Sequence, residues 1–112
     1  MKVLVVEDDR KVAGFIEQGL KEEGYVVDIA PDGEEATMLA HVYDYDVILL
    51  DVVLPQLDGI TLCRMLKSDP ATARIPLYML TAKARKADVD AATSAGADGY
   101  IHKPFRGAAS IP

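Results

Sequence analysis

Five short apolar runs recur along the chain, and their spacing is the feature that most limits how it can fold. Each run is nearly continuous and mostly rich in β-branched residues, which is typical of parallel strands buried on both faces of a sheet. The fifth run, which contains glycine, is the weakest. The runs are Val3–Val6, Val26–Ile29, Val47–Leu50, Leu77–Leu80 and Gly99–Ile101.

Amphipathic segments lie between these runs, with apolar residues repeating at helical spacing. The clearest begins after Asp9 and ends before Gly24, a residue expected just past a helix end. Others follow Asp32–Gly33 and Asp58–Gly59, and a fourth ends at Gly96. Alternating strands and helices predict a doubly wound α/β sheet with helices on both faces. The apolar stripes comprise Val12, Phe15, Ile16 and Leu20; Ala36, Leu39, Ala40 and Tyr43; Ile60, Cys63 and Leu66; and Val89, Ala92 and Ala95.

Length and composition exclude several classes of protein. The 112 residues leave room for one core, and a net charge of -6 argues against nucleic acid as a direct partner. No apolar stretch approaches the ~20 residues that span a bilayer, so membrane insertion is not expected. The single Cys63 cannot form an intrachain disulfide, and no secretory signal precedes the first apolar run. These features predict a cytoplasmic protein.

Polar side chains follow four of the five apolar runs. In an open parallel sheet, ligands bind beyond the carboxyl ends of the strands, so these residues should converge on one cleft. Carboxylates packed together repel one another unless a cation or proton intervenes, and oxygen ligands favour Mg²⁺. A lysine and a hydroxyl nearby would bind phosphoryl oxygens. The residues are Glu7, Asp8, Asp9, Asp51, Thr81 and Lys103.

A simpler interpretation exists for each residue taken alone. Asp8 or Asp9 could cap the first helix, because Asp is a preferred N-cap. Thr81 is an ordinary residue for a strand end, and Lys103 an ordinary surface lysine. Asp51 is harder to explain this way, because it follows four apolar residues and a buried carboxylate is costly without a partner. Only the joint occurrence points to a metal beside a phosphoryl group.

These motifs together resemble the receiver domain of two-component response regulators, in the CheY-like superfamily. The resemblance runs from Lys2 to about Phe105 and implies a flavodoxin-like sheet of five parallel strands in the order 2-1-3-4-5. The matching stretches are Val3 to Asp9, Asp51 to Gly59, Leu80 to Ala82 and Gly96 to Phe105.

The resemblance also implies roles for the acidic residues. Asp51 would be the phosphoacceptor. Asp8 would ligate Mg²⁺ directly and Glu7 through water, while Asp51 and the backbone carbonyl of Val53 complete the protein ligands. Asp9 would be a helix-start residue.

The remaining family positions concern the phosphoryl oxygens and the switch. Thr81 and Lys103 would hold the phosphoryl oxygens. Tyr100 occupies the place of the switching aromatic, which turns inward as Thr81 moves toward the phosphate. Without the resemblance, Tyr100 would be read as packing at a strand edge. His41 and His102 have no metal-ligand companion at useful spacing and are expected to be solvated.

By this resemblance the chain is a bacterial signalling domain rather than a conventional enzyme. It would accept a phosphoryl group from a sensor histidine kinase or a phosphotransfer protein, promote its own phosphorylation and dephosphorylation, and control an unknown effector in a phosphorelay. An alternative is a protein-interaction module of the same fold that does not use phosphate. A third reading, a phosphatase with an aspartyl nucleophile, is weak because that family expects Asp where Val53 stands.

The C-terminal residues depart from the family pattern. Receiver domains continue into a fifth helix, but here a receiver domain of residues 1–105 is followed only by a tail of residues 106–112 with Gly, Ser and Pro. We therefore expect the final helix to be truncated or absent. One face of the sheet would then stay partly apolar and open, which invites a partner or self-association.

Overall fold

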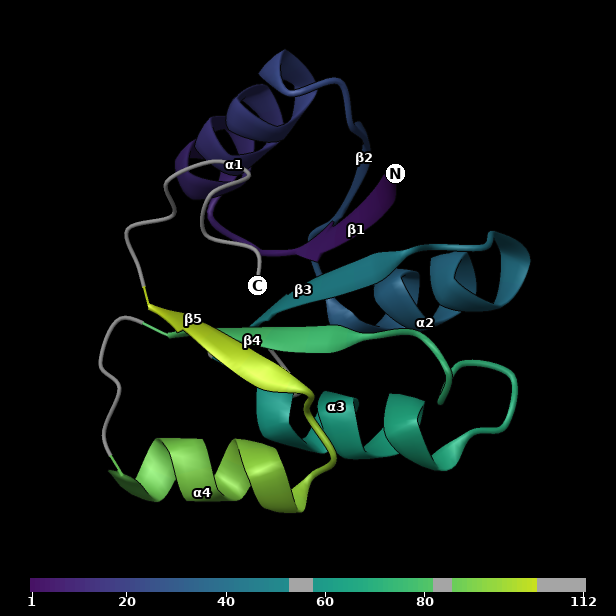
Figure 1. Cartoon of the computed structure of the whole chain (residues 1–112), viewed down its shortest axis with the longest axis vertical. Coiled ribbons are helices and arrows are strands. Elements are labelled where there is room, and N and C mark those ends of the chain that lie inside the picture. The colour runs from purple at the N-terminus through teal and green to yellow at the C-terminus, as the bar shows by residue number, and fades with distance from the viewer. Residues whose placement is uncertain (53–57, 82–85, 103–112) are drawn as a thin grey trace.

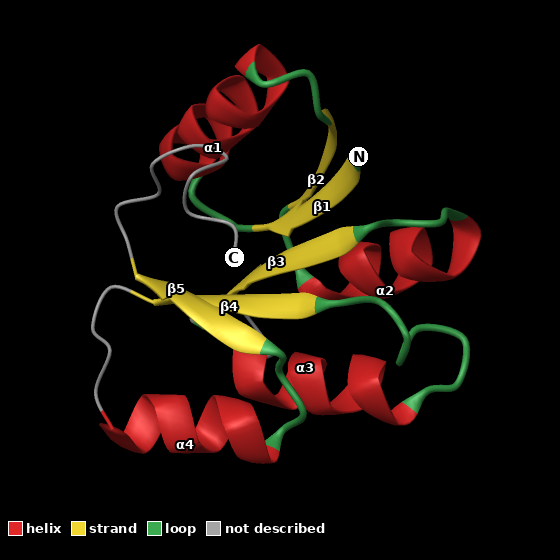
Figure 2. Ribbon diagram, in the orientation of Figure 1, coloured by secondary structure: helices red, strands yellow, loops and turns green. Residues whose placement is uncertain are grey.

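A computed structural model describes residues 1–52, 58–81 and 86–102, with Asp88 and His102 described by their backbone alone (Figures 1 and 2). Strands and helices alternate along the chain, as the apolar runs predict. Each predicted strand is present, and each is one residue longer than the apolar run that predicted it. The elements are β1 (Lys2–Val6), α1 (Arg10–Glu22), β2 (Val26–Ala30), α2 (Gly33–Val42), β3 (Val47–Asp51), α3 (Gly59–Ser68), β4 (Leu77–Thr81), α4 (Lys86–Ser94) and β5 (Gly99–His102).

The five strands form one parallel sheet in the order β2-β1-β3-β4-β5, which confirms the predicted topology. β1 lies between β2 and β3, so the chain leaves it toward one edge and later returns on its other side. Val6 pairs with Leu50, and Asp51 pairs with Leu80. This register aligns the carboxyl ends of β1, β3 and β4 at one edge of the sheet.

Helices cover both faces of the sheet, as expected for a doubly wound fold (Figure 1). α1 covers one face, where Ile16 and Leu20 pack against Val5 and Leu49. α2, α3 and α4 lie on the other face, which holds the larger cluster of buried side chains, including Leu50 and Leu66. β1 and β3 are therefore buried on both sides, which explains their continuous apolar sequence.

Three of the helices have an aspartate as their N-cap residue. The carboxylates of Asp9, Asp32 and Asp58 accept hydrogen bonds from backbone N–H groups in the first turns of α1, α2 and α3. Gly24 and Gly96 follow α1 and α4 with φ of 87° and 97°, the left-handed conformation that glycine adopts without strain. The helix limits indicated by these residues in the sequence are confirmed.

Two aromatic residues depart from the predicted helix stripes. Phe15 is 61% exposed, because the buried stripe of α1 is narrow and consists of Ala13, Ile16 and Leu20. Tyr43 follows α2 as its C-cap and is exposed, with its ring 4.1 Å from the Lys2 ammonium. The sequence placed both residues in apolar helix stripes, and neither of them belongs to the buried surface of its helix.

Leu49, Leu80 and Ile101 lie on the α1 side of the sheet and are at most 5% exposed. The open apolar face expected here, and self-association through it, stay predictions from the sequence. Residues 103–112 lie outside the described residues, so the truncated final helix stays a prediction.

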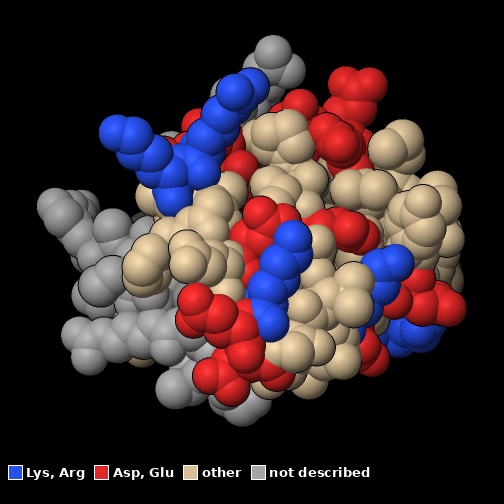
Figure 3. Space-filling view, turned by 90° about the horizontal axis from the view of Figure 1, so that it is seen from above, with Lys and Arg blue, Asp and Glu red and all other residues tan. Residues whose placement is uncertain are grey.

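The surface shows no extended basic area over the described residues visible in Figure 3, where basic side chains stand in small groups among acidic ones. This distribution agrees with the net charge of -6. Within residues 1–52, 58–81 and 86–102, no helix is long and apolar enough to cross a bilayer.

Gly59 gives a test of how tightly α3 is docked against the end of β3. Its N–H donates to the Val52 carbonyl at 2.9 Å, and a Cβ there would overlap the Asp51 carbonyl oxygen. We expect Gly59→Ala to lower the free energy of unfolding by about 1–3 kcal/mol, measured by urea titration. Gly14→Ala is the control: no atom lies within 4 Å of its added Cβ. It should raise stability by about 0.5–1 kcal/mol, and equal effects of the two variants would contradict the tight docking.

Candidate functional site

Two buried carboxyl residues stand next to each other where β1 and β3 end. Glu7 follows β1, and its N–H donates to the Ala30 carbonyl at the end of β2 (3.0 Å). Asp51 is the last residue of β3. Because Val6 pairs with Leu50, the next residue of each strand brings Glu7 beside Asp51. Glu7 is 2% exposed and Asp51 6%, so the site lies at the rim of the core.

Asp8 completes a cluster with these two residues. One carboxylate oxygen from each of Glu7, Asp8 and Asp51 lies within 4.8 Å of the others. Asp8 is exposed, so the cluster is buried on one side and open to solvent on the other. Three oxygen donors at this spacing suit a hard divalent cation such as Mg²⁺, which keeps part of its shell for water or phosphate oxygens. The donor set therefore fits the metal that the sequence predicted.

Asp9 lies beside this cluster in the sequence but serves the helix. Its Oδ1 accepts hydrogen bonds from the N–H groups of Lys11 (2.9 Å) and Val12 (3.2 Å). Taken alone, either Asp8 or Asp9 could cap the helix, and the family resemblance implied Asp9; the structure confirms Asp9 as the cap. Asp8 therefore belongs to the carboxylate cluster and not to the helix cap.

Thr81 ends β4, the strand beside β3, and is 7% exposed. Its neighbour in β5 is His102, and Tyr100 stands two residues earlier, paired with Met79. Since side chains alternate along a strand, Thr81, Met79 and Tyr100 lie on the same face of the sheet. The Tyr100 ring is 44% exposed, which agrees with an aromatic at the sheet edge.

Some predicted site residues fall outside the described part of the chain. Val53 and Lys103 are among them, so the structure does not place the predicted carbonyl ligand or the phosphoryl-binding ammonium. Glu7, Asp8 and Asp51 are brought together, and Thr81 comes from the adjoining strand.

Gly59 and Asp58 contribute to the site without having been predicted to. A side chain at Gly59 would displace the backbone of Asp51 and Val52, so glycine lets α3 approach the end of β3. Asp58 begins α3, and hydrogen bonds from the Thr61 N–H (2.8 Å) and hydroxyl (3.0 Å) lower the pKa of its carboxyl. The sequence signal was the Asp-Gly pair, which was predicted as a helix start and as the end of the stretch that resembles the family, but was given no role of its own in the site.

The family model described as the response regulator receiver domain matches residues 3–110. The chain belongs to this family. Response regulator ArlR of Staphylococcus saprophyticus is 42% identical over 104 residues, which make up 93% of this chain and 46% of that protein. Transcriptional regulatory protein CusR of Escherichia coli is 41% identical over 105 residues, 94% of this chain and 45% of that protein. This receiver domain thus spans slightly less than half the length of these curated relatives.

Solved structures of the family share the fold. A putative response regulator from Chloroflexus aurantiacus superposes with a TM-score of 0.88 and 39% identity, covering 94% of this chain and 86% of that one. The receiver domain of a sensor histidine kinase from Pseudomonas aeruginosa gives a TM-score of 0.86 and 36% identity over the same shares. That structure has a magnesium ion coordinated in its active-site cleft.

Stability measurements on variants in metal-free buffer distinguish the role of Asp8 from that of Asp9. Asp8→Asn should raise the melting temperature, because it removes a negative charge from a repelling cluster. Asp9→Ala should lower the free energy of unfolding by about 1 kcal/mol through loss of the cap, whereas Asp9→Asn should change little because Asn caps as well as Asp. Thermal melts in the presence of a chelator provide the measurement. A loss of stability in Asp8→Asn equal to that in Asp9→Ala would show that Asp8 has a structural role instead.

Proposed function

We propose that this receiver domain accepts a phosphoryl group on Asp51 in an Mg²⁺-dependent reaction, from a sensor histidine kinase or a phosphotransfer protein. The phosphoryl form would then control an effector in a phosphorelay. The observation that carries the proposal is the cluster of Glu7, Asp8 and Asp51 at the carboxyl ends of two adjacent central strands. A cluster of like charges at this position costs stability, and a bound cation followed by phosphoryl chemistry accounts for it.

The carboxylate cluster would hold the metal. Asp8 and Asp51 would bind it directly and Glu7 through water, with the Val53 carbonyl as the further protein ligand. The magnesium ion in the Pseudomonas aeruginosa receiver domain supports this assignment for a related chain. A bound Mg²⁺ neutralises charge on the carboxylates and on the incoming phosphoryl group.

Asp51 would act as the nucleophile. A carboxylate oxygen of Asp51 attacks phosphorus in line with the leaving group, so an O–P bond forms while the P–N bond to the donor histidine breaks. The histidine nitrogen keeps the bonding electron pair and is released as neutral imidazole once protonated. Thr81 would donate its hydroxyl hydrogen to a phosphoryl oxygen, and the Lys103 ammonium would balance the charge of the others. Positioning these groups is the catalytic contribution of the chain.

Water would hydrolyse the acyl phosphate by attacking phosphorus, which breaks the bond to the Asp51 oxygen and releases inorganic phosphate and the free carboxylate, so the domain would also promote its own dephosphorylation. The signal would pass through Thr81 to Tyr100. The two residues share a face of the sheet on adjacent strands, and the partly exposed Tyr100 ring would turn inward when Thr81 moves. The receiver boundary at residue 105, the tail of residues 106–112 and a cytoplasmic location stay predictions from the sequence.

The second candidate is an interaction module that keeps the fold and does not use phosphate. The cluster of Glu7, Asp8 and Asp51 favours the first candidate, because a module without phosphoryl chemistry has no use for repelling carboxylates at this edge. The two candidates differ in whether the chain takes up phosphate at all.

Magnesium should stabilise the folded domain through the cluster. A ligand that binds only the native state adds about 2.7 kcal/mol at a concentration 100 times its Kd. We therefore expect MgCl₂ to raise the melting temperature of the wild type, and Asp8→Asn to lose most of that rise. Asp9→Asn is the matched control, one residue away and outside the cluster, and should respond like the wild type. An unchanged response in Asp8→Asn would place the metal elsewhere.

Phosphorylation itself is tested by intact mass after incubation with acetyl phosphate and Mg²⁺. The wild type and Asp9→Asn should each gain one phosphoryl group, and Asp51→Asn none, because an amide is not a nucleophile of this kind. Chelation should abolish the gain. If the wild type gains no mass with either acetyl phosphate or a phosphorylated histidine kinase, the interaction module becomes the better proposal.

A further inference from the structure

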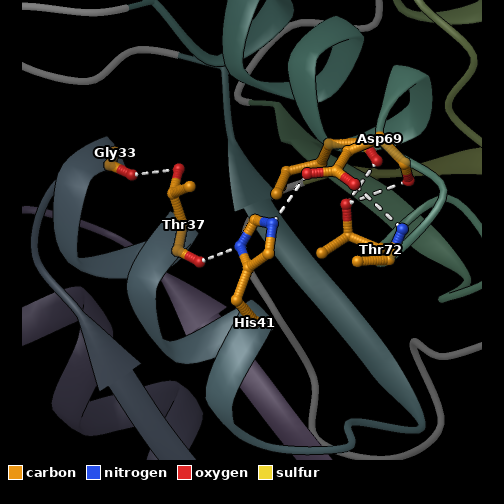
Figure 4. A network of polar contacts seen from close by, with 7 residues as sticks. Gly33, Thr37, His41, Asp69 and Thr72 are labelled. Atoms are coloured by element: carbon orange, nitrogen blue, oxygen red, sulfur yellow. Dashed lines mark hydrogen bonds and ion pairs between the residues drawn. The ribbon is translucent and has the colours of Figure 1, made fainter.

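His41 joins two helical segments of the chain that are distant in sequence (Figure 4). It lies in the last turn of α2, and its Nε2 is 2.7 Å from Oδ2 of Asp69, the residue that caps the end of α3. Its Nδ1 is 2.7 Å from the Thr37 carbonyl oxygen, one turn back in α2. The sequence predicted a solvated histidine, and the side chain is 38% exposed, but its contact with Asp69, 28 residues further along the chain, was not predicted.

Both atoms that face the ring are hydrogen-bond acceptors. A neutral imidazole carries one N–H and one lone pair, so either neutral tautomer would direct a lone pair at the Thr37 carbonyl or at the Asp69 carboxylate. Only the imidazolium, with both nitrogens protonated, donates to both oxygens. The positions of these two acceptors thus favour the protonated ring over the neutral one.

The partners of His41 are held in place by further hydrogen bonds. The Ala71 N–H donates to Oδ1 of Asp69 at 2.9 Å, which leaves Oδ2 directed at His41. The buried Thr72 hydroxyl donates to the Leu66 carbonyl at 2.6 Å and fastens the turn that carries Asp69 (Figure 4). The ring therefore meets a preorganised acceptor rather than a mobile surface carboxylate.

A second ion pair links the same segments. Arg74, between α3 and β4, pairs with Asp44, which follows α2, at 3.0 Å. Asp69 is thus the charged group that contacts His41 from the α3 side, whereas the nearby charges of Arg74 and Asp44 pair with each other.

We propose that protonated His41 is a pH-sensitive strap that fastens the end of α2 to the turn after α3, and that the strap opens when the ring loses its proton. The strap is at the far end of α3 from Gly59, where the helix meets the backbone of Asp51. It thus regulates how firmly the helix after the acidic cluster is held to its neighbour. The inference does not depend on phosphoryl transfer.

The sign of the pH dependence follows from the contacts. The Thr37 carbonyl, and then the Asp69 carboxylate, raise the pKa of His41 above its ordinary value of 6.5. A raised pKa in the folded state means that the stabilisation is complete below 6.5 and is lost as pH rises through the folded-state pKa. The side chains of His41 and Asp69 are 38% and 40% exposed, so solvent screens the attraction between them. The change in melting temperature when the ring loses its proton should therefore be about a few degrees at most.

The test is a double-mutant cycle at two pH values, with thermal melts of wild type, His41→Gln, Asp69→Asn and the double variant. Asn at position 69 can still accept from the Ala71 N–H, so the variant removes the charge and keeps the turn. At about pH 5.5 we expect Asp69→Asn to lower the melting temperature more in wild type than in the His41→Gln background. At about pH 9, where the ring is neutral and keeps a single N–H, that difference should be much smaller.

Two further measurements keep the proposal falsifiable. NMR titration of the imidazole, identified by its loss in His41→Gln, should give a pKa above 6.5 in wild type and a lower one in Asp69→Asn. Asp44→Asn is the matched control, because it breaks the neighbouring ion pair and should have the same effect at both pH values. A pKa at or below 6.5, or a coupling that does not change with pH, would overturn the strap.

Discussion

The parallel pairing of β1 with β3 at the centre of the sheet is the constraint on which the rest of the molecule depends. Both strands are buried on both faces, so their order and register are held by the whole core. A slip of one residue would turn every buried side chain of a strand to the opposite face and would separate Glu7 from Asp51. The chemistry proposed here therefore rests on apolar packing, and the acidic residues follow where that packing puts them.

That position is costly for a carboxylate. Moving an ionised group from water to the rim of a core carries a penalty on the order of several kcal/mol unless other groups compensate. The acidic residues of the chain fall into two groups, and only one group is placed where this penalty arises. Asp9, Asp32 and Asp58 face helix N-termini and are satisfied by backbone N–H groups. The cluster keeps like charges together at one place, open on the Asp8 side, where a cation can reach them.

Much of the fold follows from the sequence because buried parallel strands have a simple pattern. Short, nearly continuous apolar runs located all five strands, and glycine and aspartate located the helix ends. Periodicity shows where a helix has an apolar stripe but does not give the width of its buried part, so Phe15 was included in the stripe although it is exposed. The contact of His41 with Asp69 had no sequence signal, since it depends on the angle at which two helices pack.

The acidic site was predictable for a different reason. The edge where Glu7, Asp8 and Asp51 meet is set by topology, because carboxyl ends of adjacent parallel strands must lie together. The choice between Asp8 and Asp9 could not be made from strand position alone, since both are one short step from the strand end, and it was the family resemblance that implied Asp9 as the helix-start residue. Backbone geometry at the start of α1 decides it, by aiming Asp9 at the N–H groups of Lys11 and Val12.

The two ends of the sheet use charge in opposite ways. At the amino ends of the strands, charged groups are matched: Lys67 donates to Asp98 at 3.0 Å and to the carbonyls of Ala73 and Ile75, and Asp46 accepts from the Lys2 backbone N–H. Such contacts stabilise the turns that enter the strands, and Asp98 has a lowered pKa from its Leu77 and Lys67 hydrogen bonds despite the opposing effect of burial. At the carboxyl ends, like charges are gathered. A stable, charge-matched end allows the opposite end to keep a repelling cluster, because the free energy that the cluster costs is offset elsewhere in the same cooperative unit.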